Sequence, residues 1–160
     1  MDLRERSVLT DQECRELLAR TQAARLSFVH RGLPHIELVG LIDLDGDPVA
    51  LLADDSDIAR ALSAVISPRR LIAVQIDDLT EAEAGRWVRS VTVVARPRWI
   101  VGVDGLRACR HTAAVRGLHA APDAWFLALT HPTLAGRRTA LRAGHPRLAA
   151  AQAPKNAVAR

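Results

Sequence analysis

The sequence is poor in aromatic residues, lysine and cysteine, and these shortages narrow the classes of protein it can be. Aromatic residues make up 3% of the 160 positions, and tyrosine is absent. Few platforms therefore exist on which unpaired nucleic-acid bases can stack. The two cysteines, Cys14 and Cys109, are too few for a disulfide framework. This scarcity favours a reducing compartment, and we expect a cytoplasmic protein.

Long apolar runs are missing as well. The N-terminal stretch MDLRERSVLTDQE is charged, and no apolar run approaches the roughly 18 residues that a membrane-spanning helix needs. We therefore expect neither a signal peptide nor a membrane span. A chain of 160 residues is instead long enough to bury one ordinary hydrophobic core without disulfide support.

The formal net charge of +4 conceals an asymmetry along the chain. Residues 1–104 hold 13 arginines against 17 acidic residues, a net charge of −4. Residues 105–160 hold nine basic residues against Asp123 alone, a net charge of +8. A basic segment can bind nucleic acid or an anionic ligand. The shortage of aromatic residues disfavours nucleic acid as a partner.

The periodicity of apolar residues predicts a mainly β protein with peripheral helices. Thr10 and Glu13 have the spacing of a capping box at the start of a helix. Pro97 predicts an edge or a bulge within its strand. Turn signals separate the first three strands, and neither a βαβ rhythm nor a glycine-rich phosphate loop is present. The predicted strands cover 24–30, 35–43, 47–53, 69–78, 87–103 and 125–131, with a last short pairing over 132–141 and further helices over 58–66 and 105–118.

The end of the chain differs from the rest in composition. Residues 145–160 are rich in alanine and proline and carry basic residues. We therefore predict one barrel domain over residues 1–144 and a weakly ordered basic tail over residues 145–160.

The order of several short pieces resembles the pyridoxamine 5′-phosphate oxidase-like FMN-binding split barrels. These pieces are ARLSFV, a GLP turn, DLDGDPVALL, LIAVQIDD, SVTVVARPRWI and WFLALTHPTLAGRR, and the match runs from about residue 8 to residue 138. The resemblance implies a six-stranded antiparallel Greek-key split barrel that forms a homodimer, with FMN between the subunits. It also implies a flavin-dependent oxidoreductase that acts on a small-molecule substrate.

The family's phosphate-binding stretch reads F-R-T-x-x-G-T-K, and residues 50–57 of this chain, ALLADDSD, stand in its place. Leu51 and Leu52 replace the arginine and the threonine, and Asp57 replaces the lysine. A carboxylate 4 Å from a phosphate is repelled by roughly 4 kcal/mol at an effective dielectric constant near 20. Two side-chain donors remain as candidate cofactor-binding residues, Ser56 and Arg60.

The acidic cluster Asp54, Asp55 and Asp57 also has a local explanation. Carboxylates cap helix N-termini and are stabilised there by the helix dipole. There are two other interpretations of this cluster. It binds a divalent cation, or it binds a cationic or neutral ligand in place of the phosphate.

Two later motifs supply the remaining cofactor-binding candidates. Gly136-Arg137-Arg138 matches the family's G-R-R, although surface salt bridges explain the arginines equally well. Trp87 lies in GRWVRSV, which corresponds to the family's G-W-S-V with about two additional residues.

His30, His35 and Glu37 surround a predicted tight turn, and His35 and Glu37 share one face of a strand. They are candidates for a catalytic acid–base pair, for ligands of a metal or haem, or for ordinary polar residues on an exposed face. We take His35 and Glu37 as the catalytic candidates and predict no metal site.

The sequence therefore supports three hypotheses of different classes. The first is an FMN-dependent oxidoreductase with an altered phosphate site. The second is a flavin-free relative that uses the groove of the dimer for another ligand or a non-redox reaction. The third is a non-catalytic binding or regulatory module. Fold resemblance alone does not choose among them.

Overall fold

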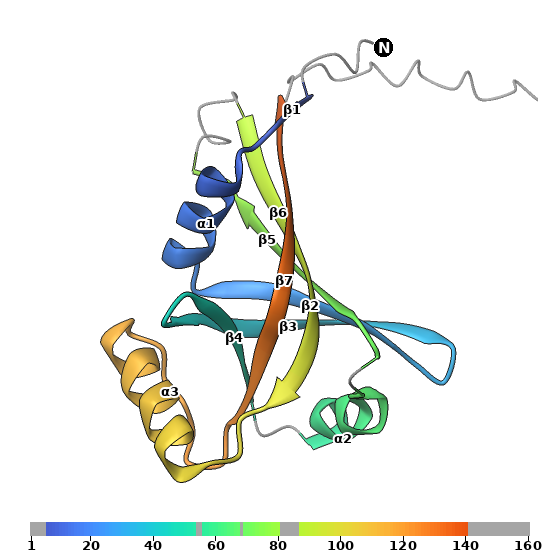
Figure 1. Cartoon of the computed structure of the whole chain (residues 1–160), viewed down its shortest axis with the longest axis vertical. Helices are drawn as coiled ribbons and strands as arrows, with labels where there is room; N and C mark the ends of the chain where they lie inside the picture. Colours follow the sequence, from blue (N-terminus) through green and yellow to red (C-terminus); the bar gives the residue numbers. More distant parts are fainter. Residues whose placement is uncertain (1–5, 54–55, 68, 81–86, 141–160) are drawn as a thin grey trace, which may run out of the picture.

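The computed structural model describes residues 6–53, 56–67, 69–80 and 87–140, except for the side chains of residues 6, 56 and 57. These residues form a mainly antiparallel β-sheet with three helices (Figure 1). In chain order the elements are β1 (Arg6–Val8), α1 (Asp11–Arg20), β2 (Ala23–His30), β3 (Leu33–Leu44), β4 (Asp47–Leu52), α2 (Ser56–Val65), β5 (Ile72–Asp78), β6 (Trp87–Trp99), α3 (Val103–Val115) and β7 (Trp125–Ala140).

The strand pairing agrees with a split barrel. The strands follow one another in the order β7, β4, β3, β2, β5 and β6, and β7 pairs a second time with β6. The β6–β7 ladder joins residues 87–99 to 127–140, whereas β4 and β7 share only the pairs from 49–52 to 125–128. Short β1 lies along the far end of β7. The Greek-key order and the dimer remain predictions.

Side chains on the two faces of the sheet enter two separate hydrophobic clusters. In β4, Ala50 and Leu52 join the main cluster inside the sheet, whereas Val49 and Leu51 face a second cluster beneath α3. Because neighbouring residues of a strand point to opposite faces, a strand that is covered on both sides is buried throughout. This is why β4 is buried from Pro48 to Leu52.

The three helices cover different parts of the sheet. α1 begins with the predicted capping box, in which the Thr10 side chain accepts a hydrogen bond from the Glu13 backbone and the Glu13 side chain accepts one from the Thr10 backbone. Helix α1 packs against β7, β6 and β3, α3 packs against β3, and α2 packs against β2 below the β2–β3 hairpin (Figure 1). At the start of α1, the two hydrogen bonds between Thr10 and Glu13 confirm the predicted capping box.

Strand β7 differs from the prediction. The sequence predicts a strand to residue 131 and a separate short pairing afterwards, but β7 is continuous from Trp125 to Ala140. His131 and Pro132 lie opposite Ala95 alone, so a β-bulge keeps the strand paired across the proline. His131 has a φ of 51°, a left-handed conformation that is uncommon for residues with a side chain. The irregularity predicted from Pro97 is therefore a bulge two residues earlier, between Val94 and Arg96.

Other expectations have mixed outcomes. Strand β6 ends at Trp99, earlier than predicted, because α3 already begins at Val103. Cys14 and Cys109 are both buried and form no disulfide. The predicted tail at 145–160 lies outside the described residues. Among the described helices, none is long and apolar enough to cross a membrane.

Candidate functional site

The outer face of β3 is covered at one end and bare at the other. Ile36 and Leu38 are 68% and 72% exposed, whereas Ile42, on the same face, is 1% exposed. Ile42 packs with Cys109 and Phe126 beneath α3. Contiguous exposed apolar side chains can mark an interaction surface.

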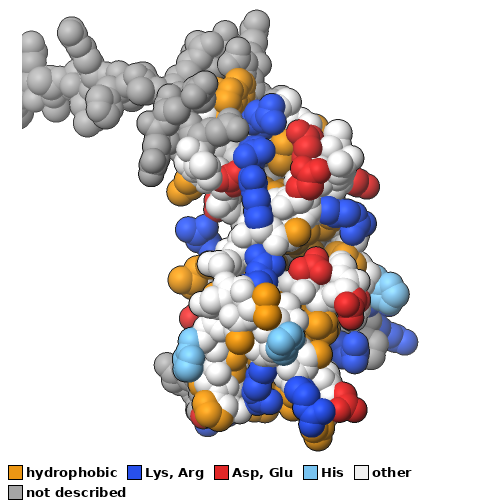
Figure 2. All heavy atoms as spheres, turned by 90° about the vertical axis from the view of Figure 1, so that its left-hand side faces the viewer, with side chains coloured by type: hydrophobic (Ala, Val, Ile, Leu, Met, Phe, Trp, Pro, Cys, Tyr) orange, Lys and Arg blue, Asp and Glu red, His pale blue; other side chains and the backbone are white. Residues whose placement is uncertain are grey.

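The neighbouring strands extend this bare face. Leu38 lies opposite Arg25 of β2, and Arg25 donates a hydrogen bond of 2.7 Å to Asp77 of β5. Val29 and Leu71 add further exposed apolar side chains. On the side of the molecule that carries α1 and α3, basic and acidic side chains are interspersed with apolar ones (Figure 2).

Gly40 lies between the exposed and the covered part of β3. A Cβ atom at this position would be 3.2 Å from the Cβ of Leu51, its partner across the ladder. A side chain larger than hydrogen would therefore crowd Leu51, and the glycine allows β3 and β4 to pack closely at this point.

His35 and Glu37 lie on the opposite face of β3, as the sequence predicts. The His35 ring stacks on Phe28 with centroids 5.0 Å apart, and the His30 ring lies 6.0 Å from it. Glu37 lines a hollow of about 40 Å³ together with Ala53 and Ile58. Glu37 therefore lies near the beginning of α2, while a catalytic role for it and His35 remains a prediction.

Helix α2 begins at Ser56, in the stretch where the resemblance places a phosphate. The side chains of Ser56 and Asp57 lie outside the described part, as do Asp54 and Asp55. Arg60 is exposed one turn further on and has an interaction partner. A helix N-terminus of this kind offers backbone N–H groups and a partial positive charge to an anion.

Leu51 and Leu52 are core residues. Leu51 is 8% exposed and belongs to the cluster beneath α3, whereas Leu52 is 3% exposed and belongs to the main cluster. The two positions at which the family has its arginine and threonine therefore contribute to packing in this chain. An arginine at either position would have to bury its charge.

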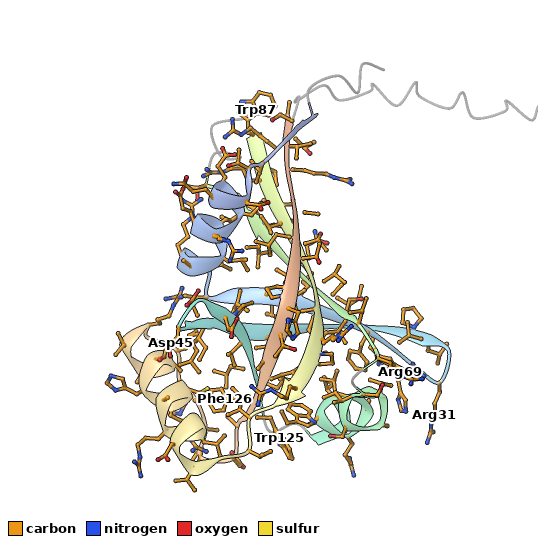
Figure 3. The ribbon with its side chains drawn as sticks, in the orientation of Figure 1. Arg31, Asp45, Arg69, Trp87, Trp125 and Phe126 are labelled. Atoms are coloured by element: carbon orange, nitrogen blue, oxygen red, sulfur yellow. The ribbon has the colours of Figure 1, made fainter. Side chains whose placement is uncertain are left out.

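Trp87, Arg137 and Arg138 lie at the other end of the β6–β7 ladder. Trp87 is the first residue of β6, opposite Ala140, far from α2 (Figure 3). Arg138 lies 3.6 Å from Glu13 of α1, and its Nε is buried with no hydrogen-bond partner among the described residues. Arg137 points to the opposite face and is exposed.

The seven predicted site residues thus form two groups within one copy of the chain. His35, Glu37, Ser56 and Arg60 belong to the hairpin and α2, whereas Trp87, Arg137 and Arg138 belong to the far end of β6 and β7. A single copy does not bring the two groups together.

Sequence reasoning missed an ion network that fixes α1. Asp78 of β5 is 8% exposed and accepts hydrogen bonds from Arg20 of α1, Arg89 of β6 and Thr80. Burial raises the pKa of Asp78, but the Thr80 hydrogen bonds and the two arginines outweigh it, so the pKa lies below the ordinary value. The pKa of Glu13 is lowered too, chiefly by the hydrogen bonds from Thr10 and then by Arg138. The acidic pair in LIAVQIDD was the only signal of this network in the sequence.

Comparison with known proteins identifies the fold. No family model and no curated protein matches the sequence. Solved structures do match. An FAD-binding protein from Mesorhizobium loti has a TM-score of 0.67 at 20% identity, with 84% of this chain and 99% of that chain covered. An FAD-binding protein from Mycobacterium smegmatis has a TM-score of 0.65 at 16% identity, with 84% and 98% covered.

A third structure, of a proposed pyridoxamine 5′-phosphate oxidase from Corynebacterium glutamicum, has a TM-score of 0.62 at 17% identity, with 86% and 96% covered. The fold is that of the flavin-binding split barrels. The resemblance drawn from short sequence pieces is confirmed at this level. At such low identities the match concerns the fold and leaves the ligand open.

Proposed function

We propose that this protein is a flavin-dependent oxidoreductase that acts on a small organic substrate, with FMN bound between two copies of the chain. The observation that carries the proposal is the bare apolar outer face at Ile36 and Leu38. Flavin-binding proteins of the same fold support it. A homodimer also gives the two separated groups of predicted residues a way to meet, since each end of one copy can face the opposite end of the other.

In this arrangement the two groups of predicted residues bind different parts of the flavin. Ile36 and Leu38, two exposed apolar side chains of β3, would hold the ring system of the flavin. The N–H groups at the start of α2 and Arg137 of the partner subunit supply donors to the phosphate, which must replace its hydration. Arg138 holds α1 through Glu13 and so positions the end of β7.

When bound, the flavin supplies the capacity to accept or donate a hydride or single electrons. The chain orients the flavin and the substrate and excludes water from the space between them. We assign proton transfer to Glu37 and His35, because carboxylate and imidazole side chains are common general acids and bases.

The test is the visible absorbance of the full-length purified protein, followed by a fluorescence-quenching titration with added FMN. We expect flavin absorbance in roughly equal amount to the chain, or saturable quenching by FMN. A colourless protein that quenches no FMN fluorescence would refute the proposal.

The buried leucines favour a second candidate, a flavin-free protein that uses the same groove for an uncharged or cationic ligand. Leu51 and Leu52 leave this junction without the family's phosphate-binding side chains. In that case the protein forms the dimer but takes up no FMN, so the oligomeric state and the flavin titration together separate the two candidates.

A further inference from the structure

A second cavity lies away from the proposed flavin groove, between α1, the β3–β4 turn and β7. Its volume is about 160 Å³. Leu18 of α1, Pro48 of β4 and Leu134 of β7 are among its apolar walls. Figure 1 shows α1 and the β3–β4 turn on the opposite side from the β2–β3 hairpin tip, and Asp45 marks this turn in Figure 3. The cavity is therefore separate from the surface discussed above.

One basic and one acidic residue line this cavity, and they do not pair with each other. Arg15 of α1 and Asp43 of β3 both belong to its wall, yet they form no ion pair with each other. Among the described residues, Arg15 has no hydrogen-bond or ion-pair partner. Asp43 accepts a hydrogen bond of 2.8 Å from the Gly46 backbone through Oδ1, so its second carboxylate oxygen remains available. A basic and an acidic residue thus border one mostly apolar space.

Two walls of the cavity are formed by a tight turn between β3 and β4 and by the bulged part of β7. The β3–β4 turn has Asp45 and Gly46 at φ values of 55° and 91°. On the other side, the bulge at His131 displaces the strand just before Pro132, which lines the cavity. A left-handed residue in the middle of a paired strand costs stability and is found disproportionately at binding sites.

We propose that this cavity binds a small zwitterion with a compact apolar body, the chemical class of a short aliphatic α-amino acid. The carboxylate of the ligand pairs with Arg15, which can hold it with two parallel hydrogen bonds. The ammonium group pairs with the available oxygen of Asp43. The aliphatic part fills the space lined by Leu18, Pro48 and Leu134.

Size and charge both restrict the ligand. A cavity of about 150 Å³ accommodates a molecule the size of benzene, so four or five carbon atoms suit this one whereas an indole ring does not. A plain carboxylate would pair with Arg15 but would be repelled by the negative charge of Asp43. A plain amine would pair with Asp43 but would be repelled by the positive charge of Arg15. Only a molecule with both charges satisfies both side chains.

The experiment is a titration of the full-length ¹⁵N-labelled protein, followed by NMR, with four probes used one at a time. The probes are L-valine, isovalerate, isobutylamine and L-tryptophan. We expect L-valine to shift the amide signals of Ala19 and Gly46 and to bind at least about tenfold more tightly than isovalerate or isobutylamine, since each lacks one charge-assisted contact. L-tryptophan should not bind at this site.

Three variants and one control assign the effect to the cavity. Arg15→Gln and Asp43→Asn should each weaken L-valine binding about tenfold. The asparagine can still accept the hydrogen bond from Gly46, so the turn is retained. Ala19→Leu should abolish binding by filling the cavity from the exposed side of α1. Arg107→Gln removes an exposed arginine on α3 and should leave binding unchanged.

The proposal is overturned if L-valine causes no saturable shift at millimolar concentrations, or if isovalerate binds as tightly as L-valine. It is also overturned if Arg15→Gln and Asp43→Asn bind like the parent protein. None of these results depends on whether the protein binds flavin.

Discussion

The two halves of β3 show how the same strand face can belong to a core or to a surface. Ile36, Leu38 and Ile42 all lie on the outer face, yet Ile42 is 1% exposed and the other two are about 70% exposed. The difference arises from α3, which packs over the end of the strand that contains Ile42. Since this face of the strand is apolar at both ends, we propose that a second copy of the chain covers the bare half.

The largest effect expected from this comparison is on folding. Ile42→Ala should lower the free energy of unfolding by about 2–5 kcal/mol, because it leaves a cavity beneath α3. Ile36→Ala, the matched change on the bare half, should alter it by no more than about 0.5 kcal/mol at a protein concentration where the chain is monomeric. Chemical denaturation monitored by circular dichroism measures both. Equal losses for the two variants would show that the halves do not differ.

The second effect is on association. Leu38→Glu should weaken the homodimer about 100-fold, because a charge on the bare half would be buried without a partner. Val101→Glu is the control, since Val101 is 80% exposed and lies on the loop before α3. Sedimentation equilibrium gives the dissociation constants. A Leu38→Glu dimer as tight as the parent one would place the interface elsewhere.

A third prediction concerns α1, which covers the sheet through charged contacts as well as apolar ones. Asp78→Asn should lower the free energy of unfolding by about 1–3 kcal/mol at neutral pH, because Arg20 and Arg89 lose their shared carboxylate.

The pH dependence of this contact has a definite direction. The folded-state pKa of Asp78 is lowered, so its stabilisation is complete above the pKa of the unfolded chain. It is lost as the pH falls through the lower folded-state value. Thermal unfolding between neutral and strongly acidic pH should therefore show a weaker acid dependence in Asp78→Asn than in the parent. An unchanged pH profile would remove Asp78 from this role.

The smallest effect separates the two neighbouring arginines. Arg137→Ala should weaken FMN binding about tenfold with little change in stability, since Arg137 is exposed and, in the proposed dimer, supplies a donor to the phosphate of the flavin in the second copy. Arg138→Ala should instead lower stability, since its side chain is half-buried beside Glu13. Quenching titrations and denaturation on both variants test this pair, and identical behaviour of the two would contradict the assignment of opposite faces.

Local patterns predicted most of the fold. The capping box at Thr10 and Glu13 and the strands around the two early turns follow from short-range rules and are confirmed. Strand β1 has three residues and no periodic signal, and it pairs only because β7 extends far enough to receive it. The bulge at His131 also depends on the partner strand. The sequence shows only Pro132, which by itself predicts a break in the strand.

The candidate site was less predictable because its residues depend on distant partners. His35 and Glu37 share a face, as the alternation in β3 requires, but nothing local places Glu37 beside α2. The G-R-R motif predicts both arginines as cofactor-binding candidates, whereas strand geometry sends Arg137 and Arg138 to opposite faces. The cavity at Arg15 and Asp43 joins three segments that are far apart in the sequence, so no motif could indicate it.

The most direct test of the central claim is sedimentation of the purified parent protein, followed both in the protein absorbance band and in the visible flavin band. The account predicts a single boundary with the mass of two chains that carries flavin absorbance. A monomer without flavin absorbance, at concentrations well above those of a stable dimer and with FMN added, would contradict it.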